Sequence, residues 1–150
     1  FQFKHTSEKE VHYILLSIKT KAAGVDNINV TLLLHCIPTI LPYIVHIINF
    51  SFETNTFPTV WKYAQVVPIA KNPTAERYHD LRPISILLTL SKVFERIIDK
   101  QLPEHLEIFD LLPDRQSGFR SNHSCGTVLL EVTDDIISAL DKKLCCYLVL

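Results

Sequence analysis

The sequence predicts a helix-rich α+β domain, and three features support this class. Apolar residues recur at helical spacing in several stretches, two β-branched runs flank a short polar loop, and turn-forming residues separate these stretches. The chain has 150 residues, of which 47% are hydrophobic and 21% charged. A chain of this length buries about 68–70% of its unfolded surface, which supplies a core without disulfides or a structural metal. The composition therefore excludes disordered, collagen-like and coiled-coil classes.

The net charge and the cysteine pattern limit how the chain could bind nucleic acid and in which cellular environment it works. The formal net charge is −1, so a nucleic acid would have to be bound by a local basic cluster. The 4 Cys form no CxxC pair and no basic leader precedes an apolar signal segment, so we expect an intracellular, reducing environment. The chain has no Met and ends in the strand-like apolar run 145–150. Both features predict a segment of a longer product, cut within a buried strand.

Helices are expected in the first third of the chain. Ser7 and Glu10 have the spacing of a capping box, and helical periodicity follows to about residue 20. Residues 27–52 contain no Asp, Glu, Lys or Arg and are long enough to cross a bilayer. Pro38 and Pro42 break this stretch, which favours a buried hairpin of two helices over a membrane span.

A β-hairpin is expected next. Residues 63–70 and 81–87 are extended runs around a polar loop, and Pro68 confines the first run to a sheet edge or a bulge. Trp61 lies just before the hairpin and Phe94 just after it, and both are expected in the core.

Helices are expected again after the hairpin. One begins near Thr89 or Ser91, and Pro103 fits the first turn of a further short helix. A turn-rich connector at 112–120 precedes a last helix at about 124–141, whose apolar stripe is typical of a packed face.

The predicted hairpin contains two cations, Lys71 and Arg82, that could bind a phosphate group. Lys71 ends one strand and Arg82 begins the other, so antiparallel pairing can bring an ammonium and a guanidinium together. A planar Arg fork beside a compact Lys charge is suited to a polyphosphate. The alternative is a solvated hairpin whose cations pair with Glu76 and Asp80 of its own loop.

Other sites find no support in the sequence. The 7 His show no HExxH spacing, and the phosphate-binding loop of ATPases is missing. Asp134 and Asp135 are expected on a solvated helix face, because neighbours on a helix diverge by about 100°. Asp26, in a Gly-Val-Asp-Asn loop, is expected to form a turn or a helix cap.

Several blocks occur in a fixed order along the chain. They are FPTVWK at 57–62, VVPIAK at 66–71, DLRPIS at 80–85, LSKVFERII at 90–98, and QSGFR at 116–120 followed by HSC at 123–125. In order and spacing they resemble the reverse transcriptase of non-LTR (LINE-type) retrotransposons, jockey-like elements especially. GVD at 24–26 and NFSF at 49–52 are similar to the upstream extension of such elements. Several linked blocks are far more specific than one short motif.

The resemblance implies an RNA-directed DNA polymerase with a right-hand fold, truncated here at its first palm strand. Residues 1–56 would be N-terminal extension helices, 57–144 the fingers region with its β-hairpin, and 145–150 the start of the palm strand. Lys71 and Arg82 match basic positions that hold the triphosphate of the incoming nucleotide.

The resemblance also implies a template-side role for one block, made of Gln116, Gly118, Phe119 and Arg120. Template RNA, primer or target DNA and deoxynucleotides are the implied partners, with no membrane, and the parent element would work in the nucleus and cytoplasm. Mg²⁺ is implied for the full-length enzyme and no cofactor for this fragment.

The chain departs from the family pattern in three ways. Asn27 stands where the family usually has Gly, and Leu81 where it usually has an aromatic residue. The two acidic motifs that bind the metals lie beyond residue 150, so no catalytic or metal residue is expected in this chain, which should be inactive alone. The alternative is a non-catalytic remnant that binds nucleic acid or a protein.

Overall fold

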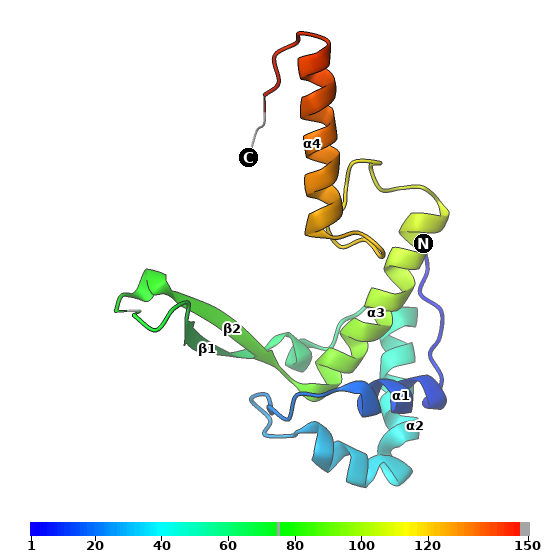
Figure 1. The fold of residues 1–150 in the computed structure, drawn as a ribbon. Helices are drawn as coiled ribbons and strands as arrows, with labels where there is room; N and C mark the ends of the chain where they lie inside the picture. The colour runs from blue at the N-terminus through cyan, green and yellow to red at the C-terminus, as the bar shows by residue number, and fades with distance from the viewer. Residues whose placement is uncertain (75, 148–150) are drawn as a thin grey trace. The chain divides into compact units, whose positions relative to one another are not determined.

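The computed structural model describes residues 1–74 and 76–147. Its elements are α1 (Glu8–Ser17), α2 (Val30–Thr54), η1 (Thr59–Lys62), β1 (Ala64–Ala70), η2 (Tyr78–Asp80), β2 (Leu81–Leu87), α3 (Thr89–Ile108) and α4 (Cys125–Asp141) (Figure 1). The predicted helix-rich class with one small antiparallel hairpin is therefore confirmed. The chain forms two compact units, Phe1–Leu102 and Pro103–Leu150, which are described separately.

The core of the first unit is apolar and partly aromatic. Phe94 is 4% exposed and Trp61 is 7% exposed, so both predicted core residues are confirmed. The Phe94 ring centroid lies 5.0 Å from that of Phe52, 5.1 Å from that of Phe57 and 5.7 Å from that of Trp61. The remaining buried apolar residues are Val11, Ile14, Leu15, Ile18, Val30, Leu33, Ile37, Ile44, Ile48, Leu88, Val93 and Ile97.

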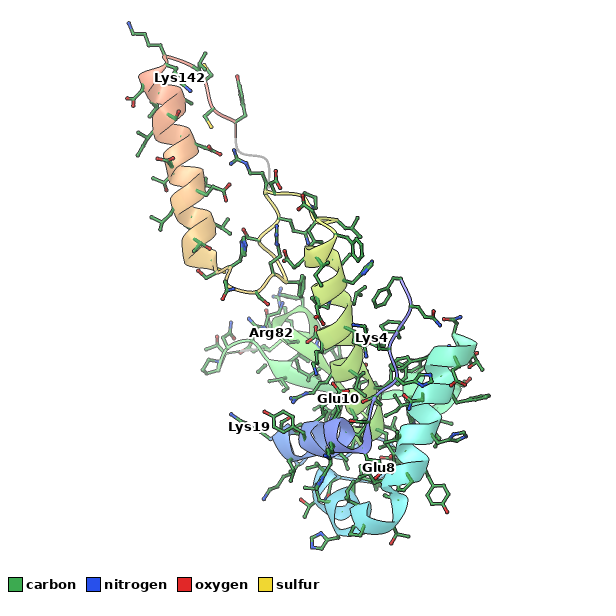
Figure 2. The ribbon with its side chains drawn as sticks, turned by 90° about the vertical axis from the view of Figure 1, so that its right-hand side faces the viewer. Lys4, Glu8, Glu10, Lys19, Arg82 and Lys142 are labelled. Carbon is green, nitrogen blue, oxygen red and sulfur yellow. The ribbon has the colours of Figure 1, made fainter. Side chains whose placement is uncertain are left out.

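Helix α1 begins at the predicted cap. The Oγ of Ser7 accepts a hydrogen bond from the backbone N–H of Glu10 at 3.3 Å. The Glu10 carboxylate instead accepts from Thr6 Oγ1 at 2.8 Å and from Lys100 Nζ at 2.6 Å. The Lys100 hydrogen bond lowers the pKa of Glu10. Through Lys100, Glu10 therefore connects the start of α1 to α3. Figure 2 labels Glu10 near both helices.

Helix α2 corrects the prediction of two helices in residues 27–52. It is one helix of 25 residues that contains both Pro38 and Pro42. Figure 1 shows its light-blue first part at an angle to its cyan second part. Each proline removes a backbone donor and displaces a carbonyl, which kinks a helix without ending it where both parts are held by packing. Val30, Leu33 and Ile37 are buried in the first part, and Ile44, Ile48 and Phe52 in the second.

By length and composition alone, α2 is also apolar enough to cross a membrane. Its mean hydropathy is 1.8, and 28% of its most apolar window is buried. Core helices of folded domains pass the same test. One face of α2 supplies much of the buried apolar surface of the first unit.

Helix α3 also continues through a proline. The prediction of a separate helix at Pro103 is wrong, because α3 runs from Thr89 to Ile108. Fourteen residues of helix precede Pro103, so nucleation is complete before the chain reaches it. Extending a formed helix adds one hydrogen bond per residue, which offsets a local defect.

The loop before α2 packs against the junction of β2 and α3. Asn27 has a left-handed φ of 59°, and its N–H donates to the Gly24 carbonyl at 3.0 Å. Asn adopts this conformation more readily than most residues, which explains how it can stand in place of Gly. The Oδ1 of Asp26 accepts from the N–H of Ile28 at 3.0 Å, so the predicted turn role of Asp26 is confirmed. Thr89 Oγ1 donates to the Ile28 carbonyl at 2.7 Å.

In the second unit, α4 (Cys125–Asp141) begins close to the expected residue but lacks the expected packing. The Oγ of Ser124 accepts from the N–H of Thr127 at 3.2 Å. No residue of α4 is buried within the described part of the chain, and Leu129 and Leu140 are 66% and 65% exposed. The predicted packed face is therefore wrong here, because helical periodicity identifies an apolar stripe without supplying what covers it.

The predicted strand at 145–150 is only partly described. Residues 145–147 have no regular secondary structure, and residues 148–150 lie outside the described part. All four Cys are exposed.

Gly24 generates a stability prediction. A Cβ there would lie 2.9 Å from both Cα and N of Leu88, which are backbone atoms that cannot easily move. We expect Gly24→Ala to destabilise the first unit by about 1–3 kcal/mol through overpacking. Denaturant unfolding followed by Trp61 fluorescence measures this, because the chain has 1 Trp and it is buried in that unit.

Gly126→Ala is the matched control. A Cβ at Gly126 meets only Ser124 Oγ at 3.6 Å, an ordinary contact. The Trp61 transition should be unchanged in this variant. Equal transitions for Gly24→Ala and the unmodified chain would contradict the close approach of the loop to Leu88.

Candidate nucleotide and nucleic-acid interface

The register of the hairpin explains its two prolines. β1 and β2 pair antiparallel, with Pro68 opposite Pro83, and the N–H of Lys71 extends the ladder by donating to the Asp80 carbonyl at 2.8 Å. Hydrogen-bonded pairs alternate along such a ladder, which puts the Pro68–Pro83 pair at a non-hydrogen-bonded site. Because the backbone N–H groups at such a site point away from the partner strand, the two prolines remove no hydrogen bond between β1 and β2. Each proline instead leaves the outer edge of its strand without one N–H donor. The prolines therefore disfavour the addition of a third strand.

The same register puts Lys71 and Arg82 on one face of the ribbon. Arg82 pairs with Ile69, whereas Lys71 lies opposite Asp80. Side chains alternate between faces along a strand, so the two cations are diagonal neighbours two positions apart. The predicted juxtaposition is thus present in the backbone, and the phosphate-binding role stays a prediction.

Among the residues that the structure describes, Lys71 and Arg82 form no ion pair with Glu76 or Asp80, whereas His79 of the same loop does pair with Asp80. The carboxylate of Asp80 contacts His79 Nε2 at 3.1 Å and accepts from the N–H of Arg77 at 3.3 Å. The Nζ of Lys71 donates to the His79 carbonyl at 2.5 Å. The Arg82 guanidinium makes no hydrogen bond or ion pair with any residue that the structure describes. Arg82 is therefore available to a ligand, and Figure 2 labels it at the hairpin.

Both faces of the hairpin are open to solvent. Val66 on one face is 59% exposed, and Ile69 and Ile84 on the other are 51% and 43% exposed. The ribbon extends away from α1 and α2 of the same unit (Figure 1). A two-stranded hairpin without a covered face is marginally stable in water, so this arrangement is typical of a surface that meets a partner.

In the second unit, Arg120 is engaged by its own chain. Its Nε and Nη2 donate to the two carboxylate oxygens of Glu107 at 2.9 and 2.8 Å. Its Nη1 donates to the carbonyls of Pro113 at 3.3 Å and Gln116 at 3.4 Å. The bidentate pair lowers the pKa of Glu107 and raises that of Arg120. We call these contacts the Arg120 clamp.

The other predicted template-side residues lie in the clamped connector. Phe119 has a left-handed φ of 62° and a fully exposed ring, at 104%. Gly118 has open space where a Cβ would be, and its carbonyl accepts from Gln116 Nε2 at 3.4 Å. The structure thus gathers Gln116, Gly118 and Phe119 with Arg120, and their contact with a template stays a prediction.

A pocket lies between this connector and the start of α4. Its volume is about 520 Å³, and it is lined by Ser117, Gly118, Phe119, His123, Ser124, Cys125, Val128 and Leu129. His123 Nδ1 lies 3.1 Å from Ser117 Oγ. Sequence reasoning did not connect Ser117 with His123, nor Arg120 with Glu107. The Arg120–Glu107 pair spans 13 residues, which no local pattern would have identified.

The described residues offer no metal site. They contain no group of three or more His, Cys, Asp or Glu that could hold an ion. Asp135 accepts from Arg115 Nη1 at 2.6 Å, and Glu131 from the same atom at 2.9 Å. Asp135 is thus an exposed ion-pair partner on α4.

Comparison with known proteins gives relatives over most of the chain. No family model matches it. The chain is 37% identical over 128 residues, 84% of its length, to the "Probable RNA-directed DNA polymerase from transposon BS" of Drosophila melanogaster. It is 36% identical over 105 residues to the corresponding polymerase from transposon X-element, and 30% identical over 104 residues to that from mobile element jockey, both of the same species.

This chain is homologous to the RNA-directed DNA polymerases of Drosophila non-LTR elements. The family resemblance seen in the sequence, including its jockey-like character, is therefore confirmed. The homology is to a part of these polymerases, because the chain spans 14%, 12% and 11% of the lengths of the three relatives named above.

The Arg120 clamp predicts a pH dependence. The pKa of a Glu is ordinarily about 4.3, and that of Glu107 should be lower because Arg120 hydrogen-bonds its charged form. The stabilisation is fully present above the ordinary value and is lost as the pH falls through the lowered one. NMR titration of the side-chain carboxyl carbon measures this pKa.

Arg120→Ala should return the pKa of Glu107 towards its ordinary value. Arg115→Ala is the control, because Arg115 pairs with Glu131 and Asp135 and should leave the titration of Glu107 unchanged. An ordinary Glu107 pKa in the unmodified chain would mean that the clamp does not form in solution.

Proposed function

We propose that this chain contributes the triphosphate and template contacts of a non-LTR reverse transcriptase. In this proposal residues 1–56 are the N-terminal extension, 57–144 the fingers region, and 145–150 the start of the first palm strand. The observation that carries the proposal is the hairpin of this polymerase homologue, which has Lys71 and Arg82 on one exposed face. Template RNA, primer or target DNA and deoxynucleotides are the proposed partners, as the names of the relatives imply.

The chemistry of the hairpin suits a triphosphate. A guanidinium donates two parallel hydrogen bonds to phosphate oxygens and an ammonium adds a compact charge, so the pair neutralises and orients one polyanion. Arg82 is available for this, and Lys71 would exchange its bond to the His79 carbonyl for one to phosphate. The bond given up is to a neutral acceptor, and contacts between ionised groups are stronger.

The template role is proposed for the connector of the second unit. Gln116, Gly118, Phe119 and Arg120 lie within five residues of each other, next to a pocket of about 520 Å³. Connectors held by a rigid scaffold often carry binding residues. The Arg120 clamp supplies such rigidity here.

The full-length enzyme would use a divalent metal, for which Mg²⁺ is our proposal. Two-metal phosphoryl transfer needs carboxylates that clamp both ions, and the described residues do not supply such a set. The catalytic carboxylates are therefore assigned to a part of the polymerase outside this chain.

A second candidate function is a non-catalytic module that binds nucleic acid or a protein. The exposed apolar stripe of α4 and the open hairpin faces favour it. The two candidates differ in one measurable property, because only the polymerase fragment should recognise a nucleoside triphosphate through Lys71 and Arg82.

Substitution of the hairpin cations tests the proposal. Charge-assisted contacts are worth about 1.5–3 kcal/mol each, so Lys71→Ala or Arg82→Ala should weaken binding of a deoxynucleoside triphosphate at least about tenfold. Titration calorimetry with the chain measures the affinity. In a polymerase that carries this segment, either change should lower kcat/KM for nucleotide by a similar factor and spare template affinity.

Lys62→Ala is the matched control for charge. Lys62 is an exposed cation in η1, just before the hairpin and away from its loop. Its loss should change triphosphate affinity little. Unchanged affinity in both hairpin variants, or an equal loss in all three, would overturn the triphosphate assignment.

A second test concerns catalysis by the chain alone. We expect no incorporation of nucleotides on a primed RNA template at any Mg²⁺ or Mn²⁺ concentration, because the proposed metal ligands lie outside the chain. A primer-extension assay with circular dichroism as a folding check measures this. Metal-dependent extension by the purified chain would show that the ligands are within it.

A further inference from the structure

We propose that the pocket beside Phe119 receives one unpaired base of single-stranded RNA, stacked on the Phe119 ring, and that Arg120 is a positioning residue acting through Glu107. This inference rests on the proposed template-side role of the connector and specifies it. In this inference the RNA base contacts the Phe119 ring and the pocket beside it, and Arg120 does not contact the nucleic acid directly.

The conformation of Phe119 is the first observation. A bulky residue with a positive φ is a rare conformation that costs about 1–3 kcal/mol, and such outliers gather at functional sites. The ring of Phe119 is also completely exposed, so burial of the side chain does not offset this cost. Phe119 therefore buries no surface within the fold, whereas its exposed aromatic face is free to contact a ligand.

The Arg120 clamp explains how this conformation is held. Arg120 follows Phe119 directly, and its guanidinium binds one carboxylate and two carbonyls. These contacts join the end of α3 to both sides of the turn around residues 113–116. The side chain is only 16% exposed, so its donors face the protein. A guanidinium used in this way fixes the backbone next to Phe119 and is not free to contact phosphate.

The pocket has ample room for a base and a lining that can contact one. Ligand pockets commonly measure about 300–1,000 Å³, and this one is about 520 Å³. Val128 and Leu129 line its apolar side, while His123 and Ser117 provide groups that can donate and accept hydrogen bonds. Proteins read unpaired bases by combining an aromatic platform with hydrogen bonds to base edges.

Charge favours a base over the phosphate backbone at this site. Residues 103–150 contain eight Asp or Glu and four Lys or Arg, a formal charge of −4. Residues 1–102 contain eleven Lys or Arg and eight Asp or Glu, a formal charge of +3. A negatively charged unit repels phosphates, but stacking on a ring needs no neutralisation. The phosphate contacts are therefore better placed on the first unit.

The experiment uses the 150-residue chain and a single-stranded oligoribonucleotide with one 2-aminopurine base. Stacking quenches the fluorescence of this base, and the titration gives the affinity. Loss of one stacked base weakens binding by roughly 5- to 150-fold, which is the expected effect of Phe119→Ala together with loss of quenching. Phe119→Trp should retain both.

Phe109→Ala is the matched control. Phe109 is an exposed aromatic residue of the same unit that does not line the pocket. Its substitution should leave affinity and quenching unchanged. Equal losses in Phe109→Ala and Phe119→Ala would overturn the proposal, as would unchanged binding in Phe119→Ala.

The salt dependence of RNA affinity shows whether Arg120 positions Phe119 or contacts a phosphate directly. Arg120→Ala and Glu107→Gln should both reduce quenching, with no change in the slope of log affinity against log salt. A direct phosphate contact by Arg120 would lower this slope by about 0.7 in Arg120→Ala and leave it unchanged in Glu107→Gln. That result would overturn the positioning role. Circular dichroism of each variant tests whether its helices are retained.

The triphosphate titration distinguishes failure of this inference from failure of the proposed function. If Phe119→Ala binds RNA normally while Lys71→Ala and Arg82→Ala lose triphosphate affinity, the pocket assignment is wrong and the polymerase proposal stands. If the unmodified chain binds neither RNA nor triphosphate, both are wrong. RNA binding that depends on Phe119 supports the pocket.

Discussion

The structure of the first unit depends on one crowded junction, where β2 passes into α3. Gly24 approaches the backbone of Leu88 too closely for any Cβ, and Thr89 hydrogen-bonds to the Ile28 carbonyl. Ser91, which is fully buried, donates to the Trp61 carbonyl. The loop before α2, the segment before β1 and the start of α3 therefore converge on a few residues. The direction in which the hairpin leaves the helices is set at this point, and with it the position of Lys71 and Arg82.

The second unit is organised by polar contacts where the first uses packing. None of its described residues belongs to the buried apolar cluster. Arg120 and Arg115 instead connect the connector to the end of α3 and to α4, through Glu107 in one case and Glu131 with Asp135 in the other. Ion pairs at the surface contribute little free energy but hold one geometry when bidentate. The conformation of this unit therefore depends more on oriented ion pairs than on buried apolar side chains.

Local signals in the sequence predicted much of the fold. The cap at Ser7, the hairpin around residues 71–80, and Trp61 in the core all follow from short-range chemistry and agree with the structure. Pro38 and Pro42 misled the prediction, because packing on both sides of them outweighs a missing donor. Pro103 did so because fourteen residues of helix already precede it. The Arg120 clamp and the pocket could not be predicted, since they join residues that share no periodicity.

The exposed hairpin has a thermodynamic consequence for any ligand that it binds. A two-stranded ribbon in water samples many conformations, so part of the free energy of binding is spent on ordering it. Affinity then depends on the stiffness of the ribbon as well as on Lys71 and Arg82. A substitution on the opposite face, at Val66 for example, would change affinity without touching the ligand. Pro68 and Pro83 already restrict the backbone, and thus lower the entropy that a ligand must remove.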